Sequence, residues 1–159
     1  MGEGRQRVAA VTEGDGPPRR IDCAIDPEGA AAVAADGPAP EVEGPGAAVW
    51  RIWAADGPPE IGEAEPAHGP SFFPPPGGSR VYVSEMPVDP SPIDPATRLH
   101  ATETVDIAIV LSGRVRLFQG DGTDVEVGPG EIVIQPGTEH AWENPGPDPA
   151  RVAFILLGA

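Results

Sequence analysis

Short apolar segments separated by turn residues are the feature that most constrains how this chain can fold. Six such segments follow one another after residue 102, and glycine or proline turns such as Gly128-Pro129-Gly130 separate them. The segments are residues 103–111, 114–119, 123–127, 131–135, 139–143 and 151–157. Apolar runs of this length between turns are typical of β-strands, and six in succession indicate a closed or sandwiched antiparallel sheet. The sequence therefore predicts an all-β fold.

The first half of the chain contributes additional strand candidates. Two apolar stretches within residues 20–35 flank the turn sequence Asp26-Pro27-Glu28-Gly29, which predicts a hairpin. Residues 47–55 and 80–86 are further candidates. We expect these N-terminal strands to reinforce one sheet of the domain and to be able to exchange with a second subunit.

The length of the chain bounds its domain organisation. A chain of 159 residues has room for one modest hydrophobic core. Residues 1–18 are polar and end in a stretch rich in glycine and proline, which predicts a flexible tail. We therefore expect one domain over residues 19–159, with the core of the barrel at about residues 80–157.

A long segment rich in proline and glycine, residues 56–79, separates two of the predicted strands. Loops of this length without secondary structure are uncommon in compact domains unless they act as a lid, a binding loop or an arm. The segment carries Phe72 and Phe73, and we expect it to cover one end of the barrel, with one of these rings contacting a pocket lined by Trp142. The alternative is that it wraps the exterior or reaches a second subunit.

Composition excludes several classes of function. The formal net charge is −15, which disfavours nucleic acid and anionic membrane as partners. All ten basic residues are arginines, so chemistry that needs a lysine amine is excluded. The single cysteine, Cys23, allows no intrachain disulfide and indicates a reducing compartment. Because the first twenty residues have no apolar region like that of a signal peptide, we expect a soluble, cytoplasmic protein.

Strand parity brings together a set of side chains that could hold a metal ion. If the chain is extended from His100, then His100, Thr102 and Asp106 share one face of a strand, because side chains alternate. The same argument places His140, Trp142 and Asn144 on one face of a later strand. Two imidazoles and one carboxylate with open coordination positions suit Fe(II), Mn(II), Zn(II) or Ni(II). The alternative is a metal-free pocket in which both histidines are hydrogen-bonded residues of the barrel lining.

These residues give the chain a resemblance to the cupin superfamily of small β-barrels. The first cupin motif, G-x5-H-x-H-x3,4-E-x6-G, is similar to the pattern of His100, Thr102, Asp106 and Gly113. The second, G-x5-P-x-G-x2-H-x3-N, is matched by Gly137, His140 and Asn144. The sequence departs from the family pattern at four places: Asp94 replaces the leading glycine, Thr102 the second histidine and Asp106 the glutamate, and the interval from Gly130 to His140 is one residue short, with Pro136 displaced.

The resemblance implies a jelly-roll barrel, also called a double-stranded β-helix, that forms a homodimer and acts on a small molecule. It implies a divalent metal at His100, Asp106 and His140, which we expect to be the catalytic residues, and a pocket that includes Thr102, Trp142, Asn144, Phe72 and Phe73. A metal there would act as a Lewis acid in a dehydration, isomerisation or cyclisation of an oxygenated substrate, as in a lyase or isomerase. Two alternatives are an Fe(II)-dependent oxygenase with the same ligands and a ligand-binding cupin without catalytic activity.

Overall fold

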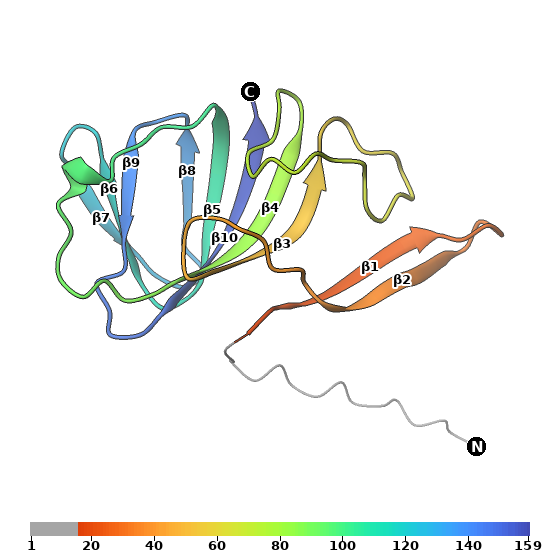
Figure 1. Ribbon diagram of the computed structural model, residues 1–159, viewed down its shortest axis with the longest axis horizontal. Coiled ribbons are helices and arrows are strands. Elements are labelled where there is room, and N and C mark those ends of the chain that lie inside the picture. The colour runs from red at the N-terminus through yellow and green to blue at the C-terminus, as the bar shows by residue number, and fades with distance from the viewer. Residues whose placement is uncertain (1–15) are drawn as a thin grey trace, which may run out of the picture.

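The computed structural model describes residues 16–159, which form ten strands arranged in three sheets (Figure 1). The strands are β1 (Arg19–Ile25), β2 (Ala31–Pro38), β3 (Ala48–Ala55), β4 (Ser79–Met86), β5 (Thr104–Ser112), β6 (Val115–Gln119), β7 (Asp124–Val127), β8 (Ile132–Pro136), β9 (His140–Glu143) and β10 (Ala150–Gly158). A short 3-10 turn, η1 (Pro95–Thr97), lies between β4 and β5. The predicted all-β class is confirmed. Each predicted strand is present with bounds that agree within one residue, except that β2 continues three residues beyond the predicted hairpin, to Pro38.

Two of the sheets form the barrel. The larger has the order β3-β4-β10-β5-β8 and the smaller the order β7-β6-β9 (Figure 1). A cluster of buried residues from both sheets fills the space between them, and it includes Val110 of β5, Val115 and Leu117 of β6 and Val152 of β10. The neighbouring strands pair antiparallel throughout, as a jelly roll requires.

The alternation of side chains along β5 decides what faces the interior. Thr104, Asp106, Ala108 and Val110 are buried, whereas the residues between them are only partly covered. The interior therefore receives polar as well as apolar side chains from this strand. The apolar residues of the other parity lie on the outer face of the large sheet.

The passage from the large sheet to the small one depends on a glycine. Gly113, between β5 and β6, has a backbone φ of 73°, which residues other than glycine rarely adopt. A Cβ at this position would also lie 2.6 Å from the Cα of Ala150. The glycine thus permits both the sharp turn and the close approach of β10.

Only some of the N-terminal strands reinforce the barrel, although all of them were expected to do so. Strand β3 does so, because it pairs with β4 at the edge of the large sheet. Strands β1 and β2 pair only with each other and project from the barrel as a two-stranded arm (Figure 1). The predicted hairpin is correct, but its reinforcing role is wrong for this arm, whose residues Ile21, Ile25 and Val33 remain exposed.

The predicted tail falls mainly on residues 1–15, which lie outside the described residues. Two of its last residues make defined contacts: Arg151 donates a hydrogen bond to the carbonyl of Gly16, and the amide of Ala39 donates to that of Pro18. Gly16 and Pro18, which the prediction assigned to the tail, therefore contact the folded part of the chain. Within residues 16–159, no helix has the length and apolar character needed to span a membrane.

Candidate functional site

The interior of the barrel contains a cavity of about 530 Å³. Its lining combines side chains from both barrel sheets with residues of the long loop between β3 and β4. Among the residues predicted to form the site, His100, Thr102, Asp106, His140, Trp142, Phe72 and Phe73 line this cavity.

His100 and His140 are brought together by the backbone. The amide of each residue donates a hydrogen bond to the carbonyl of the other, at 3.0 and 2.9 Å, so the two form an isolated antiparallel bridge. Residues paired in this way project their side chains on the same side. The ring centroids accordingly lie 4.6 Å apart, with His140 buried and His100 exposed.

Both rings are oriented by the same local contact. The Nδ1 atom of His100 lies 3.0 Å from the carbonyl oxygen of Arg98, and that of His140 lies 2.8 Å from the carbonyl oxygen of Thr138. Because a carbonyl oxygen only accepts, Nδ1 carries the proton in each ring, and the neutral ring keeps its lone pair on Nε2. Burial lowers the pKa of His140 below its usual value, which favours that neutral form near pH 7.

The carboxylate of Asp106 is held by hydroxyl groups of its own strand face. Thr104 Oγ1 lies 2.5 Å from Asp106 Oδ1, and Thr102 Oγ1 donates to Asp106 Oδ2 at 3.3 Å. The two threonine hydroxyls are themselves 2.9 Å apart. Asp106 is only 8% exposed, so these contacts replace much of the water that the carboxylate would otherwise bind.

The histidine pair fits a divalent metal ion better than the predicted three-ligand set does. Two neutral imidazoles with free Nε2 lone pairs on one side of the barrel are suitable ligands for first-row divalent ions. Over residues 16–159, however, no group of three His, Cys, Asp or Glu side chains is arranged to hold a metal. The structure therefore does not bring Asp106 into a ligand set with His100 and His140, because its oxygens face the hydroxyls of Thr102 and Thr104.

The long loop supplies part of one wall of the cavity through Phe72 and Phe73. The rings of Phe72 and Tyr82 stack with centroids 4.3 Å apart and planes 4° from parallel. The hydroxyl of Tyr82 donates to the carbonyl of Phe72 at 2.8 Å. Trp142 lines the same cavity, with its ring edge-on to both His140 and Phe154.

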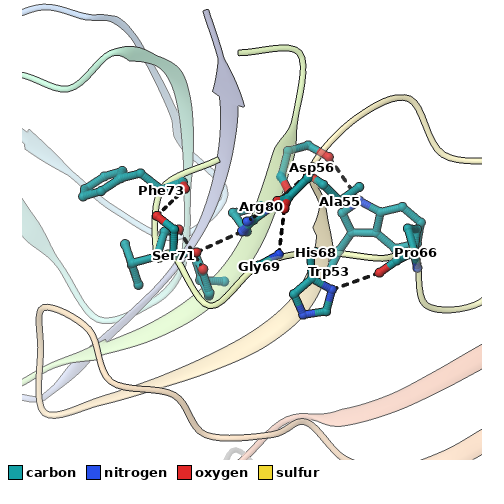
Figure 2. A network of polar contacts seen from close by, with 12 residues as sticks. Trp53, Ala55, Asp56, Pro66, His68, Gly69, Ser71, Phe73 and Arg80 are labelled. Carbon is teal, nitrogen blue, oxygen red and sulfur yellow. Dashed lines mark hydrogen bonds and ion pairs between the residues drawn. The ribbon is translucent and has the colours of Figure 1, made fainter. Parts of the chain in front are cut away.

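A buried arginine fixes this loop to the barrel (Figure 2). The guanidinium of Arg80, 1% exposed, donates to the carbonyls of Ala55 and Ser71 and pairs with Asp56 at 2.6 Å. The second carboxylate oxygen of Asp56 accepts from the amide of Gly69 at 2.7 Å. The loop is thus attached at its start and again directly before Phe72.

The prediction that Asn144 lines the pocket is wrong. Its side chain is fully buried, and its Nδ2 donates to the carbonyls of Met86 and Asp148, at 2.9 and 3.0 Å. Its Oδ1 accepts from the amide of Gly146. These three bonds occupy the amide in the turn before β10, where it holds that turn against the end of β4.

Several residues that line the cavity or contact its polar groups were not singled out from the sequence. Thr104 shares the parity of Asp106, so its position in the interior was available from the alternation of β5. Tyr82 and Phe154 belong to strands in which apolar residues occupy both parities, so the alternation alone did not mark them. Arg98 also lines the cavity, and its charge is paired with Asp89 at 2.9 Å.

Comparison with known proteins agrees with this architecture. A family model described as a cupin domain matches residues 84–156. The chain is 36% identical over 61 residues to oryzines biosynthesis cluster protein J of Aspergillus oryzae, covering 38% of this chain and 34% of that protein. It is 32% identical over 85 residues to phomopsin biosynthesis cluster protein C' of Diaporthe leptostromiformis, covering 53% of this chain and 42% of that protein. The matched regions thus span less than half the length of either curated relative.

Solved structures show the same fold. The crystal structure of the DMSP lyase DddQ from Ruegeria pomeroyi aligns with a TM-score of 0.50 at 17% sequence identity. The alignment covers 76% of this chain and 56% of that protein. At this level of identity the likeness concerns the arrangement of the strands alone.

Proposed function

The chain belongs to the cupin family, and from this membership and the pairing of His100 with His140 we propose that it is a small-molecule enzyme that uses a divalent metal ion. The reaction we propose is a dehydration, isomerisation or cyclisation of an oxygenated organic substrate, as in a lyase or isomerase. Both curated relatives are named as biosynthesis cluster proteins, which supports a role in small-molecule metabolism. The cavity of about 530 Å³ has the size of sites that take small organic ligands.

The histidine pair is the observation that carries this proposal. Nε2 of His100 and Nε2 of His140 would hold the ion, since Nδ1 of each ring is engaged with a backbone carbonyl. An ion at this place supplies Lewis-acid polarisation of a carbonyl or hydroxyl oxygen. Asp106 faces the same cavity and can accept a hydrogen bond from a substrate hydroxyl or take up its proton.

Metal binding by matched variants tests the proposal. Metal-free protein is titrated with Co(II), and binding is followed by visible absorption and by calorimetry. The wild type and His68→Gln should bind one equivalent, because His68 lies in the loop and its Nδ1 contacts the carbonyl of Pro66. His140→Gln should lose most of this binding. Equal binding by His140→Gln and the wild type would exclude the histidine pair as the metal site.

Two further measurements separate the alternative functions. Uptake of dioxygen by the Fe(II)-loaded protein during turnover would favour an Fe(II)-dependent oxygenase. Ligand binding by a protein that takes up none of the four candidate ions would favour a cupin that binds without catalysing.

We also propose that the protein is a homodimer, on the evidence of the outer face of the large sheet. An apolar surface, here called the outer apolar face, crosses strands β10, β5 and β8; its residues are Ile107, Ile109, Ile132, Ile134, Ile155 and Leu157. Ile107 lies opposite Ile155 on one side and Ile134 on the other. Contiguous apolar surface of this kind is unusual on a monomer.

A second copy of the chain suits this face. Two identical apolar sheet faces can pack against each other about a twofold axis, so that each covers the other. The β1–β2 arm projects from the same molecule with exposed apolar residues of its own, including Ile21 and Val33, and can reach a neighbouring barrel.

A further inference from the structure

The cavity is divided into a polar end and an aromatic wall. The polar end consists of His100, Thr102, Asp106 and His140. The aromatic wall, as defined here, consists of Phe72, Phe73, Tyr82, Trp142 and Phe154. A ligand that fills the cavity must therefore present different chemistry at its two ends.

The aromatic wall continues from the loop to the histidine pair. The centroids of Phe73 and Phe72 are 5.2 Å apart, and Phe72 stacks on Tyr82. Tyr82 and Phe72 pack in one cluster with Phe154, whose ring meets Trp142 edge-on at 6.0 Å. Trp142 in turn lies 6.1 Å from His140. A flat apolar group can contact these rings along its length while its end reaches the polar groups.

The wall is formed before any ligand enters. Burial raises the pKa of Tyr82, so its hydroxyl stays protonated and keeps donating to the carbonyl of Phe72. Arg80 holds the preceding residue, Ser71, through its carbonyl. A surface that is already ordered loses little conformational freedom on binding, which favours rigid, flat ligands.

In the metal-free chain, the charges that line the cavity disfavour an anionic ligand. Arg98 is the cation of the lining, and its guanidinium is paired with Asp89 at 2.9 Å. The carboxylate of Asp106 is contacted by threonine hydroxyls rather than by a cation. A second carboxylate brought to this end would be repelled by Asp106, with no free guanidinium to offset the repulsion.

The geometry points to a substrate that is flat and mainly apolar, with a hydroxyl or carbonyl group at the end that meets the histidines; where no metal ion is bound, an uncharged ligand of this kind is favoured over an anionic one. This inference deepens the proposed function and rests on it for the identification of the cavity as the substrate site. The aromatic wall then determines specificity: Phe72 and Trp142 select the flat body, while Asp106 and Thr102 hydrogen-bond the oxygenated end.

Binding of simple probes to the metal-free full chain tests the inference. The probes are 2-naphthol, which is uncharged at pH 7, and 2-naphthoate, which has the same body and a carboxylate; both are followed by calorimetry. We expect 2-naphthol to bind and 2-naphthoate to bind more weakly. Phe72→Leu, which keeps apolar volume but removes the flat ring, should weaken 2-naphthol binding about 2- to 10-fold. Phe118→Leu is the matched control, because Phe118 lies on β6 outside the cavity lining.

A substitution of Asp106 tests whether its charge disfavours an anionic ligand. Asp106→Asn removes the repulsion, so it should narrow the difference in affinity between 2-naphthoate and 2-naphthol. The inference is overturned if 2-naphthol fails to bind, if 2-naphthoate binds more tightly, or if Phe72→Leu and Phe118→Leu behave alike. Because no metal is present, these results are independent of the Co(II) titration: failure of Co(II) binding with normal 2-naphthol binding would count against the metal enzyme and not against this ligand class.

Discussion

The carboxylate of Asp106 is a buried charge whose solvation is supplied by two threonines. Thr104 and Thr102 replace water as donors to its two oxygens. When a buried acceptor loses its donor, the free-energy cost of its desolvation is no longer compensated. For a charged group this cost exceeds the net contribution of an ordinary hydrogen bond to stability. The threonines therefore position Asp106 and also determine whether its burial is tolerated.

Replacing one of these donors should destabilise the fold. We expect Thr104→Val, which keeps the shape of the side chain, to lower the free energy of unfolding by about 1–3 kcal/mol. Urea denaturation measures this loss. Thr123→Val is the control, because the hydroxyl of Thr123 donates to Asp121 at 2.6 Å in an exposed turn where water can substitute. Its loss should stay within about 0.5 kcal/mol. Equal losses in the two variants would contradict a special role for Thr104.

The parity of the strands explains how much of the site could be predicted from the sequence. Alternation from His100 places Thr102 and Asp106 on one face, and all three residues line the cavity. Strand parity does not indicate which groups donate hydrogen bonds to a given carboxylate. The hydrogen bond from Thr104 to Asp106 could therefore not be predicted. Strand parity also failed for Asn144, because the turn after β9 redirects the chain and uses the amide for its own backbone.

At the scale of elements, the loop of residues 56–79 is fixed by one ion pair between distant residues. Asp56 and Arg80 are 24 positions apart, and the loop between them carries Phe72 into the cavity. Short strands were predictable because glycine and proline mark their ends locally. This pairing was not, since nothing near Asp56 in the sequence identifies its partner. The separate β1–β2 arm was not predicted for the same reason. A hairpin is determined by residues near one another in the sequence, whereas its packing against a sheet depends on residues far from it in the sequence.

The ion pair makes the attachment of the loop dependent on pH. The hydrogen bond from Arg80, together with that from the Gly69 amide, lowers the pKa of Asp56 below its usual value. The unfolded chain therefore binds this proton more readily than the folded chain does. The stabilisation is fully present above about pH 4, the usual range of an aspartate, and is lost as the pH falls through the lowered pKa.

Comparison of the wild type with Asp56→Asn isolates this contribution. We expect the variant to have the lower free energy of unfolding at pH 7, and the difference between the two proteins to shrink as the pH falls below about 4. Urea denaturation at a series of pH values measures the difference directly. A difference that stays constant from pH 7 to pH 3 would show that the carboxylate charge of Asp56 does not stabilise the loop.

At the scale of the whole molecule, the large sheet differs from an ordinary antiparallel sheet, in which the inner face is apolar and the outer, solvent-exposed face is polar. The inner face of the large sheet carries Arg80, Asp106 and Gln135, all buried. The outer apolar face carries isoleucines, of which Ile132 and Ile134 are 59% and 57% exposed. The fold thus places polar groups around the cavity and leaves an apolar surface exposed on the outside, and burial of this surface would favour association. The formal charge of −15 opposes association with acidic partners, a second copy included, so the apolar contact must outweigh that repulsion.

Oligomeric state measured by light scattering tests this balance. We expect the wild type to be a dimer and Ile134→Glu to be a monomer at micromolar concentration, because a carboxylate on the outer apolar face would be buried without a partner in the dimer. Ile61→Glu introduces the same charge at a residue that is 99% exposed on the long loop, and it should remain a dimer. Raising the salt concentration should strengthen the wild-type dimer, since it screens the repulsion between two acidic chains while leaving the apolar contact in place. A monomeric wild type, or a dimer that Ile134→Glu leaves intact, would rule out this face as the interface.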